Sequence, residues 1–437
     1  MATGKEIARR IFQQTLASID IPRVMERKLP REGMRLILPD ALVDLSQIEK
    51  IYVVAIGKAA HAMVDGLEGL LPKGTRIAGI VVAPVAPGRP VIGMEYFVGG
   101  HPVPNADSWK SAEAILRLLK NCDERTLVIF LLSGGGSALC ELPLYAEMKL
   151  EDVQVVNRAL VTCGAPIEAL NTVRKHFSAV KGGRLAVAAG RARKITLAVT
   201  DVPAGKESAL ASGPTLPDPS TIADVQRIVA QYDLRKRFPE RLMRWLNAGE
   251  MPETPKGGDT AFANASFQLL LGMDDLFHAA HHAAEACGYA PCCDNSTDDW
   301  PVAKAADRLL QQLEEWQRLN HGRRVAIIAD GELSSPVTGN GVGGRNSAFV
   351  LDLAGKIAGR RVTVLSAGTD GIDGNSPAAG AVADGETMER AKAAGLDRQK
   401  AFRESDAYTF FERLGDAIVT GPTGNNLRDL RILLAEE

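Results

Sequence analysis

Two positions in the sequence combine a positively charged side chain with neighbouring glycines, an arrangement that can hold an anion. Lys58 follows Gly57 at the end of a short apolar run, and Arg345 follows the glycine-rich stretch 339–344. A lysine ammonium is a point charge that can hold a phosphoryl group or a carboxylate, and the planar fork of an arginine suits the same anions. A surface lysine without a function would also fit the first position. We therefore interpret Lys58 and Arg345 as candidate anion-binding cations.

A loop of serines and glycines follows a longer apolar run. The run Thr126–Leu132 leads directly into Ser133, Gly134, Gly135, Gly136 and Ser137. Glycines leave the backbone N–H groups of such a loop accessible, and successive N–H groups form a nest for an anion, most often a phosphate. A tight glycine turn is the alternative interpretation. Repetition favours the nest, because similar loops follow other apolar runs, one of them with Thr420 and Gly421.

A group of cations between residues 171 and 184 is a further candidate for phosphate binding. It includes Lys181, which is followed by Gly182. A solvated helix face would have a similar composition, so both interpretations stay open at this point. We take Lys181 and Gly182 as predicted phosphate-binding residues.

Three aspartates follow an apolar run or lie in a glycine-rich turn, where they could take part in proton transfer or metal binding. Asp201 comes directly after the run 195–200, and Asp370 and Asp373 lie in the segment 368–374. A carboxylate can accept a hydroxyl proton, and oxygen ligands on a loop suit Mg²⁺ held jointly with nucleotide phosphates. A helix cap and a pair of Asp-Gly turns are the alternatives. We predict Asp201 as catalytic and Asp370 and Asp373 as metal ligands, although which aspartate is base and which binds metal stays open.

The rest of the sequence predicts the elements that position these residues. Apolar runs alternate with segments long enough for helices, which is typical of a doubly wound α/β domain. The runs are 51–56, 77–83, 126–132 and 195–200, then 325–329, 362–365 and 416–419. Residues 1–50 have apolar residues near helical spacing, so we expect them to be helical. In an open parallel sheet, ligands bind at the carboxyl ends of the strands, where the candidate residues lie.

Glycines and prolines in the segment 247–259 indicate a linker between two domains. We expect a Rossmann-like parallel sheet that binds nucleotide or phosphate in residues 1–250, and a smaller α/β domain in residues 259–437. The predicted fold class is α/β, with the active site in the cleft between the two domains.

The composition is that of an ordinary globular protein and excludes some classes of partner. The 437 residues contain 51 Lys and Arg against 53 Asp and Glu, a formal net charge of −2. This balance predicts no nucleic-acid partner but is compatible with a small anionic substrate. The lack of a signal peptide and of an apolar stretch of about 18 residues predicts a cytoplasmic protein with no membrane partner. Six scattered cysteines have no metal-binding spacing, and the sequence leaves a homodimer open.

Several short motifs, in order along nearly the whole chain, resemble the glycerate 2-kinase family. The motifs that resemble its amino-terminal domain are Ile56–Ala59, Gly99–Asn105, Leu132–Ala138 and Arg174–Gly183. The motifs that resemble its smaller carboxyl-terminal domain, named MOFRL, are Gly343–Asn346, Ala367–Gly374 and Thr420–Gly424.

The resemblance implies an enzyme that transfers the γ-phosphoryl group of ATP to the 2-hydroxyl of D-glycerate in the presence of Mg²⁺, which gives 2-phosphoglycerate. The resemblance makes Lys58 and Arg345 the best-supported catalytic residues. They would belong to opposite domains, which are expected to close over the substrates. The chain is similar to a branch linked to tartrate degradation, some members of which have carried the label hydroxypyruvate reductase.

Two other functions stay as alternatives. An NAD(P)H-dependent hydroxypyruvate reductase needs a dinucleotide fingerprint directly after a strand, and the G-x-G-x-x-G match at 339–344 follows its apolar run only after about nine residues. A protein that binds small anions without catalysis would gain nothing from aspartates at the strand ends.

Overall fold

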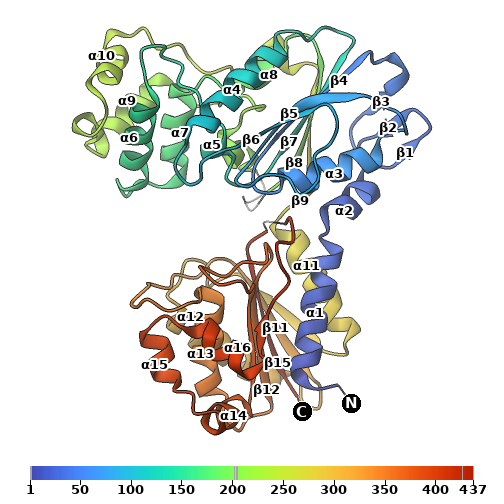
Figure 1. The fold of residues 1–437 in the computed structure, drawn as a ribbon, viewed down its shortest axis with the longest axis vertical. Helices are drawn as coiled ribbons and strands as arrows, with labels where there is room; N and C mark the ends of the chain where they lie inside the picture. The colour runs from blue at the N-terminus through green and yellow to red at the C-terminus, as the bar shows by residue number, and fades with distance from the viewer. Residues whose placement is uncertain (1, 201, 203–204, 426, 437) are drawn as a thin grey trace. The chain divides into compact units, whose positions relative to one another are not determined.

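The structure is a computed structural model that describes residues 2–200, 202, 205–425 and 427–436. Its contacts divide the chain into two compact α/β units (Figure 1). The first is Ile21–Leu271, and the second joins Met1–Asp20 to Gly272–Glu437. The α/β class is as predicted, but these bounds differ from the expected 1–250 and 259–437.

Helix α1 (Gly4–Ser18) belongs to the second unit because its partners lie far away in the sequence. Its buried residues include Ile7, Ile11 and Phe12, which recur at helical spacing and form one apolar face. This face packs against α11 (Met273–Ala286) and against strands of the second sheet. Sequence proximity alone assigns α1 to the wrong unit.

The segment 247–259 lies inside the first unit and is not the expected linker. The N–H group of Asp218 donates a hydrogen bond to the carbonyl of Pro255 at 3.0 Å, which ties the segment to the preceding loop. The strand that follows, β9 (Ala265–Leu271), is the last strand of the first sheet. The two units therefore join at residues 20–21 and 271–272.

The first unit is built on a six-stranded sheet in which all neighbouring strands are parallel. In spatial order the strands are β6 (Met94–Val98), β5 (Ile77–Ala83), β4 (Lys50–Ile56), β7 (Thr126–Leu132), β8 (Arg193–Val199) and β9. The chain starts in the middle at β4, moves outward through β5 and β6, and returns to β7 beside β4. This is the order of a doubly wound fold, and the crevice between β4 and β7 is where such folds bind ligands.

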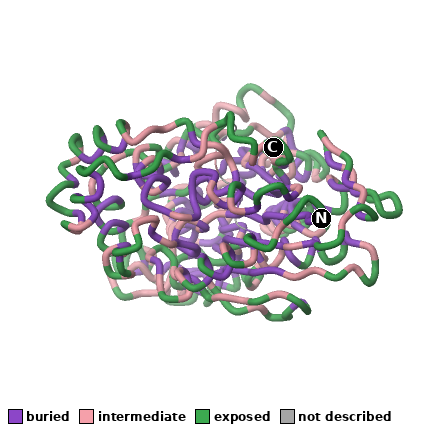
Figure 2. Tube along the Cα trace, turned by 90° about the horizontal axis from the view of Figure 1, so that it is seen from above, coloured by how far each residue is buried: buried purple, intermediate pink, exposed green. Residues whose placement is uncertain are grey.

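Helices cover both faces of this sheet, which explains the continuous apolar runs of its strands. β7 is buried along its whole length. α4 (Ala106–Leu119) and α8 (Arg184–Ala188) share a core with Val54 and Phe130, and α3 (Ala60–Leu70) contacts β4, β5 and β7. Buried residues run through the interior, and exposed residues lie mainly at the periphery (Figure 2).

Smaller elements complete the first unit. Four helices with their own apolar core are α6 (Leu150–Val161), α7 (Ile167–Phe177), α9 (Ile222–Gln231) and α10 (Glu240–Ala248). The other elements are α2 (Ile21–Lys28), β1 (Arg31–Glu32), β2 (Arg35–Ile37), β3 (Leu42–Asp44) and α5 (Gly136–Leu139). The expectation of a helical segment 1–50 is thus wrong beyond residue 28, because β1, β2 and β3 form a small antiparallel sheet.

The second unit has a mixed six-stranded sheet. In spatial order its strands are β10 (Ala290–Asp294), β11 (Val325–Asp330), β15 (Asp429–Ala435), β12 (Val362–Gly368), β13 (Gly380–Asp384) and β14 (Ala417–Ile418). β10 and β11 are parallel, and β15 runs antiparallel to both β11 and β12. The carboxyl ends of β10, β11 and β12 therefore share one edge with the start of β15.

Helices lie on both sides of the second sheet (Figure 1). Besides α1 and α11 they are α12 (Val302–Leu319), α13 (Arg345–Lys356), α14 (Thr387–Ala393), α15 (Arg398–Arg403) and α16 (Ala407–Leu414). α12, α13 and α16 share a core with Ile327 and Val364, whereas α1 and α11 pack on the other side. No helix within the described residues is both long and apolar enough to cross a bilayer.

Gly57 determines how closely the loops after β4 and β7 approach each other. Its φ is +137°, and an added Cβ would lie 2.1 Å from Ser133 Oγ and 2.6 Å from the Ser133 carbonyl oxygen. We expect Gly57→Ala to lower the free energy of unfolding by about 1–3 kcal/mol, because it adds backbone strain and a collision.

Gly69→Ala is the matched control for this prediction. Gly69 lies in α3, and an added Cβ would meet nothing within 4 Å in the described structure. Alanine there should raise the free energy of unfolding slightly, by up to about 0.5–1 kcal/mol, because its helix propensity is higher than that of glycine. Urea unfolding of both variants is the measurement, and equal effects would contradict the close approach at Gly57.

Candidate active site

In the first unit, the loops after β4 and β7 are held together at the switch point of the sheet. The N–H group of Lys58 donates to the carbonyl of Gly134 at 2.9 Å. The N–H group of Ala59 donates to the hydroxyl oxygen of Ser133 at 3.0 Å. The predicted lysine and the predicted glycine loop are therefore neighbours, and the exposed Lys58 side chain starts at the point where a ligand enters such a fold.

His101 joins this pair, although we assigned it no role from the sequence. An added Cβ on Gly135 would lie 3.1 Å from the His101 ring and 3.4 Å from Lys58 Cγ, so both side chains lie beside this glycine. Burial, and after it the charge of Lys58, lowers the pKa of His101 below its ordinary value. The sequence feature that could have identified His101 is the motif Gly99–Asn105, which follows β6 at the same edge of the sheet.

The far end of the glycine loop is supported by a chain of hydroxyl and amide groups. The hydroxyl groups of Ser137 and Ser212 are 2.8 Å apart, and Ser212 donates to Asn171 Oδ1 at 3.0 Å. Ala211 and Ser212 have φ values of +49° and +59°, which are strained for residues with a side chain. Such strain is typical of functional sites and indicates that this turn is held in place by its surroundings.

The predicted phosphate ligands Lys181 and Gly182 lie beside this turn, since Gly182 N–H donates to the Ser212 carbonyl at 3.0 Å. The Lys181 side chain, however, is buried and bonded to Glu141, which also accepts from Ser178 Oγ at 2.6 Å. A phosphate at Lys181 would have to compete with this buried carboxylate. The lysine therefore has a clear structural role, and its role in phosphate binding stays a prediction.

In the second unit, Arg345 is the first residue of α13 and is paired with two carboxylates. Its Nη1 donates to Glu332 at 2.9 Å, and its Nε and Nη2 donate to the two oxygens of Asp429. Burial lowers the pKa of Arg345, but the hydrogen bond and charge of Asp429 outweigh it and raise the pKa above its usual value. The guanidinium is thus permanently charged and held in one orientation at the carboxyl edge of β11.

Asp373, predicted as a metal ligand, is bonded to the start of α13. Its carboxylate accepts from Asn346 N–H at 2.9 Å, from Ser347 N–H at 2.8 Å and from Ser347 Oγ at 2.6 Å. Burial raises the pKa of Asp373 against these lowering contacts. These three donors stabilise the start of the helix through the carboxylate, and the role of Asp373 as a metal ligand stays a prediction.

The other predicted residues of the second unit lie in two loops that interlock. Gly371 has a φ of +89°, and an added Cβ would lie 2.1 Å from the Gly421 carbonyl oxygen. Thr423 N–H donates to the Asp370 carbonyl at 3.1 Å, and the carboxylate of Asp370 accepts from Ile372 N–H at 3.0 Å. The structure thus brings Asp370 close to the loop that contains Thr420 and Gly421.

A complete metal cage made of side chains is not found in the part of the chain that the structure describes, where no three His, Cys, Asp or Glu residues are arranged around one point. Mg²⁺ commonly takes only one or two carboxylates and completes its shell with water and substrate phosphates. Asp370 fits that minimal requirement. Asp201 lies outside the described residues.

Asp330, at the end of β11, is a buried carboxylate to which we assigned no catalytic or metal-binding role from the sequence. Within the described structure neither of its oxygens has a hydrogen-bond partner, and Arg428 Nη1 lies 3.9 Å from Oδ2. Burial raises the pKa of Asp330 to about 6, against the lowering effect of Arg428 and Arg431. The proton is therefore bound more tightly in the folded protein than in the unfolded chain.

This shift predicts a pH dependence of stability with a defined sign. The folded state holds the proton up to about pH 6, whereas the unfolded chain releases it near 3.8, the ordinary pKa of an aspartate. The contribution of Asp330 to the free energy of unfolding should thus fall by roughly 1–3 kcal/mol as the pH rises from about 4 to 7. Chemical unfolding of wild type and Asp330→Asn across this range isolates the effect, and a constant difference between the two curves would contradict it.

Two family patterns match this chain, and both fit the two-part fold. "Domain of unknown function (DUF4147)" matches residues 7–247, and "MOFRL family" matches residues 325–429. A D-glycerate 2-kinase from Thermotoga maritima is 32% identical over 432 residues, which cover 98% of this chain and 97% of that protein. A putative hydroxypyruvate reductase from Agrobacterium vitis is 35% identical over 439 residues, covering 99% and 94%.

A solved structure extends the similarity to three dimensions. The crystal structure of a glycerate kinase from Thermotoga maritima has a TM-score of 0.84 and 32% identity, and the match covers 99% of both chains. The fold thus defines a two-unit α/β protein with a parallel sheet and a MOFRL unit. The chain belongs to the glycerate 2-kinase family with a MOFRL carboxyl-terminal domain, as the motifs indicated.

Proposed function

We propose that this protein is an ATP-dependent glycerate kinase. It transfers the γ-phosphoryl group of ATP to the 2-hydroxyl of D-glycerate, and the product is 2-phosphoglycerate. The observation that carries the proposal is Lys58 at the switch point of the first sheet, against the glycine loop 133–137 and beside His101. The names of relatives such as the Thermotoga maritima D-glycerate 2-kinase support the same activity.

In this mechanism the two cations stabilise the charge that develops on the transferred phosphoryl group. In this proposal Lys58 of the first unit and Arg345 of the second are the two cations. The glycine loop 133–137 leads into the short helix α5, and its backbone N–H groups are the proposed ligands of the phosphate oxygens. Asp201 or Asp370 accepts the hydroxyl proton or holds Mg²⁺, which when bound neutralises phosphate charge.

Hydroxypyruvate reduction is the second candidate, because the name of the Agrobacterium vitis relative points to it. In dinucleotide-binding sheets of this strand order, the first loop is a G-x-G-x-x-G turn and an acidic residue near the end of the second strand binds the ribose. Here the first loop has Gly57 followed by Lys58, and the second strand, β5, ends at Ala83 before Pro84. This region favours phosphate binding over NAD binding.

A pair of coupled assays on the purified protein tests the proposal. We expect ADP to form only when D-glycerate, ATP and Mg²⁺ are all present, and no NADH or NADPH oxidation with hydroxypyruvate. NADH oxidation without glycerate-dependent ADP formation would establish the reductase instead. Binding of glycerate by calorimetry without turnover of ATP would indicate a small-anion-binding protein.

A further inference from the structure

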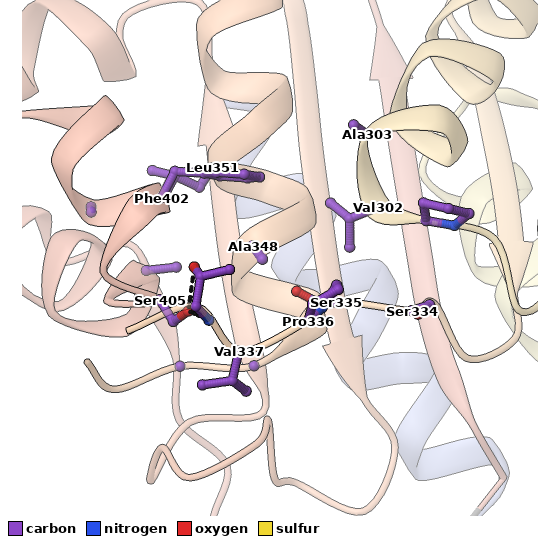
Figure 3. Close-up of a pocket in the computed structure, with 16 residues that line it drawn as sticks. Val302, Ala303, Ser334, Ser335, Pro336, Val337, Ala348, Leu351, Phe402 and Ser405 are labelled. Carbon is purple, nitrogen blue, oxygen red and sulfur yellow. Dashed lines mark hydrogen bonds between the residues drawn. The ribbon is translucent and has the colours of Figure 1, made fainter. Parts of the chain in front are cut away.

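The second unit contains a cavity of about 260 Å³ to which no function has been assigned above (Figure 3). It lies where the parallel strands β10 and β11 end, between the start of α12, the loop after β11, the start of α13 and helix α15. The carboxyl edge of parallel strands is the usual ligand position in α/β folds. Its volume is close to the lower end of the range for small-molecule pockets, about 300–1,000 Å³.

The residues that line this cavity determine which kind of ligand it can bind. None of the lining residues, all of which the structure describes, carries a charge. Two of them, Val337 and Phe402, are large apolar side chains with exposed fractions of 82% and 42%. Ser335 and Ser405 add hydroxyl groups at the wall, as Figure 3 shows. Such a site suits an uncharged, largely apolar ring with a few polar edges, and it does not suit glycerate or a phosphate group.

The cavity is joined to Arg345 by the chain itself. Gly343 and Gly344 line the cavity, and the next residue is Arg345, whose guanidinium lies at the same edge of the sheet. A ligand with a flat apolar ring at one end and phosphates at the other would match both features. The N-terminus of α13 is less suited to the phosphates, because the carboxylate of Asp373 already accepts from the N–H groups of Asn346 and Ser347.

We propose that this cavity binds the purine base of the nucleotide that donates the phosphoryl group. Gly343 and Gly344 then lie between the base and Arg345, the cation that contacts the phosphates. This inference rests on the proposed kinase function. It assigns the base to the second unit and leaves the acid substrate outside the cavity.

Filling the cavity is the first test. Ala303 is exposed and lines the cavity from α12, so Ala303→Trp should occupy the space of the base. We expect KM for ATP to rise about tenfold or more, while KM for glycerate and kcat at saturating ATP stay the same. Gln311→Trp, at an exposed position of the same helix outside the cavity, is the matched control and should change none of these constants.

A second variant and a binding measurement keep the test independent of turnover. Phe402→Ala removes an exposed aromatic wall and should weaken ADP binding by about tenfold in calorimetry, with pyrophosphate binding unchanged. Unchanged ADP affinity in both variants would overturn the inference, as would a rise in KM for glycerate. If wild type forms no ADP from glycerate, the kinase proposal fails. Binding of adenosine that Ala303→Trp abolishes would still establish a base pocket.

Discussion

Replacement of Lys58 by alanine should lower kcat/KM for glycerate phosphorylation by about 10²–10³, which corresponds to ~3–4 kcal/mol of transition-state stabilisation. The reason is that Lys58 brings a positive charge to the switch point where the glycine loop meets the end of β4. Its side chain is exposed, so the substitution should leave the free energy of unfolding nearly unchanged. Steady-state kinetics with ATP and D-glycerate, together with urea unfolding, are the measurements.

Lys73→Ala is the control for this variant, because Lys73 is exposed in the same unit but lies in the turn after α3. It should retain wild-type turnover. Lys58→Arg keeps the charge with a different shape and should recover part of the lost rate. Near wild-type turnover of a folded Lys58→Ala protein would remove this lysine from the mechanism.

Arg345→Ala should have an effect of similar size, about 10²–10³ in kcat/KM, because in the proposed mechanism it removes the second positive charge that stabilises the transferred phosphoryl group. This variant also has a structural consequence, since it leaves Asp429, only 4% exposed, without its partner. Loss of one member of a buried pair is destabilising. A loss of activity alone would therefore not separate the two roles.

A double variant separates the structural role of Arg345 from its catalytic role. Arg345→Ala with Asp429→Asn removes the unpaired carboxylate, so it should recover stability relative to Arg345→Ala in urea unfolding. It should not recover kcat. Recovery of both stability and turnover in the double variant would mean that Arg345 acts only as a structural partner of Asp429.

The sequence predicts the four inner strands of the first sheet, β5, β4, β7 and β8, because they are mostly buried and have continuous apolar runs. The outer strands β6 and β9 are more exposed and were not among the predicted runs. The sequence also predicts that Lys58 and the loop 133–137 lie close together, since both follow strands of one parallel sheet. His101 belongs to the same edge, but β6 is an edge strand with a mixed burial pattern, so the apolar signal that leads to its loop is weak.

What the sequence could not predict depends on partners that lie far away along the chain. The residue type of Lys181 is compatible with phosphate binding, and only the fold shows that Glu141 is bonded to it in the core. Asp373 has the composition of a metal ligand, but its oxygens accept from a helix that begins earlier in the chain. The membership of α1 in the second unit depends on packing with α11, which follows it by more than two hundred residues.

Product analysis by ³¹P NMR tests the central claim most directly. Wild-type protein incubated with ATP, Mg²⁺ and D-glycerate should give one new phosphomonoester resonance that coincides with added 2-phosphoglycerate, and Lys58→Ala should give little of it in the same time. A resonance that coincides with 3-phosphoglycerate would contradict phosphorylation at the 2-hydroxyl. The absence of any new phosphomonoester would contradict the kinase itself.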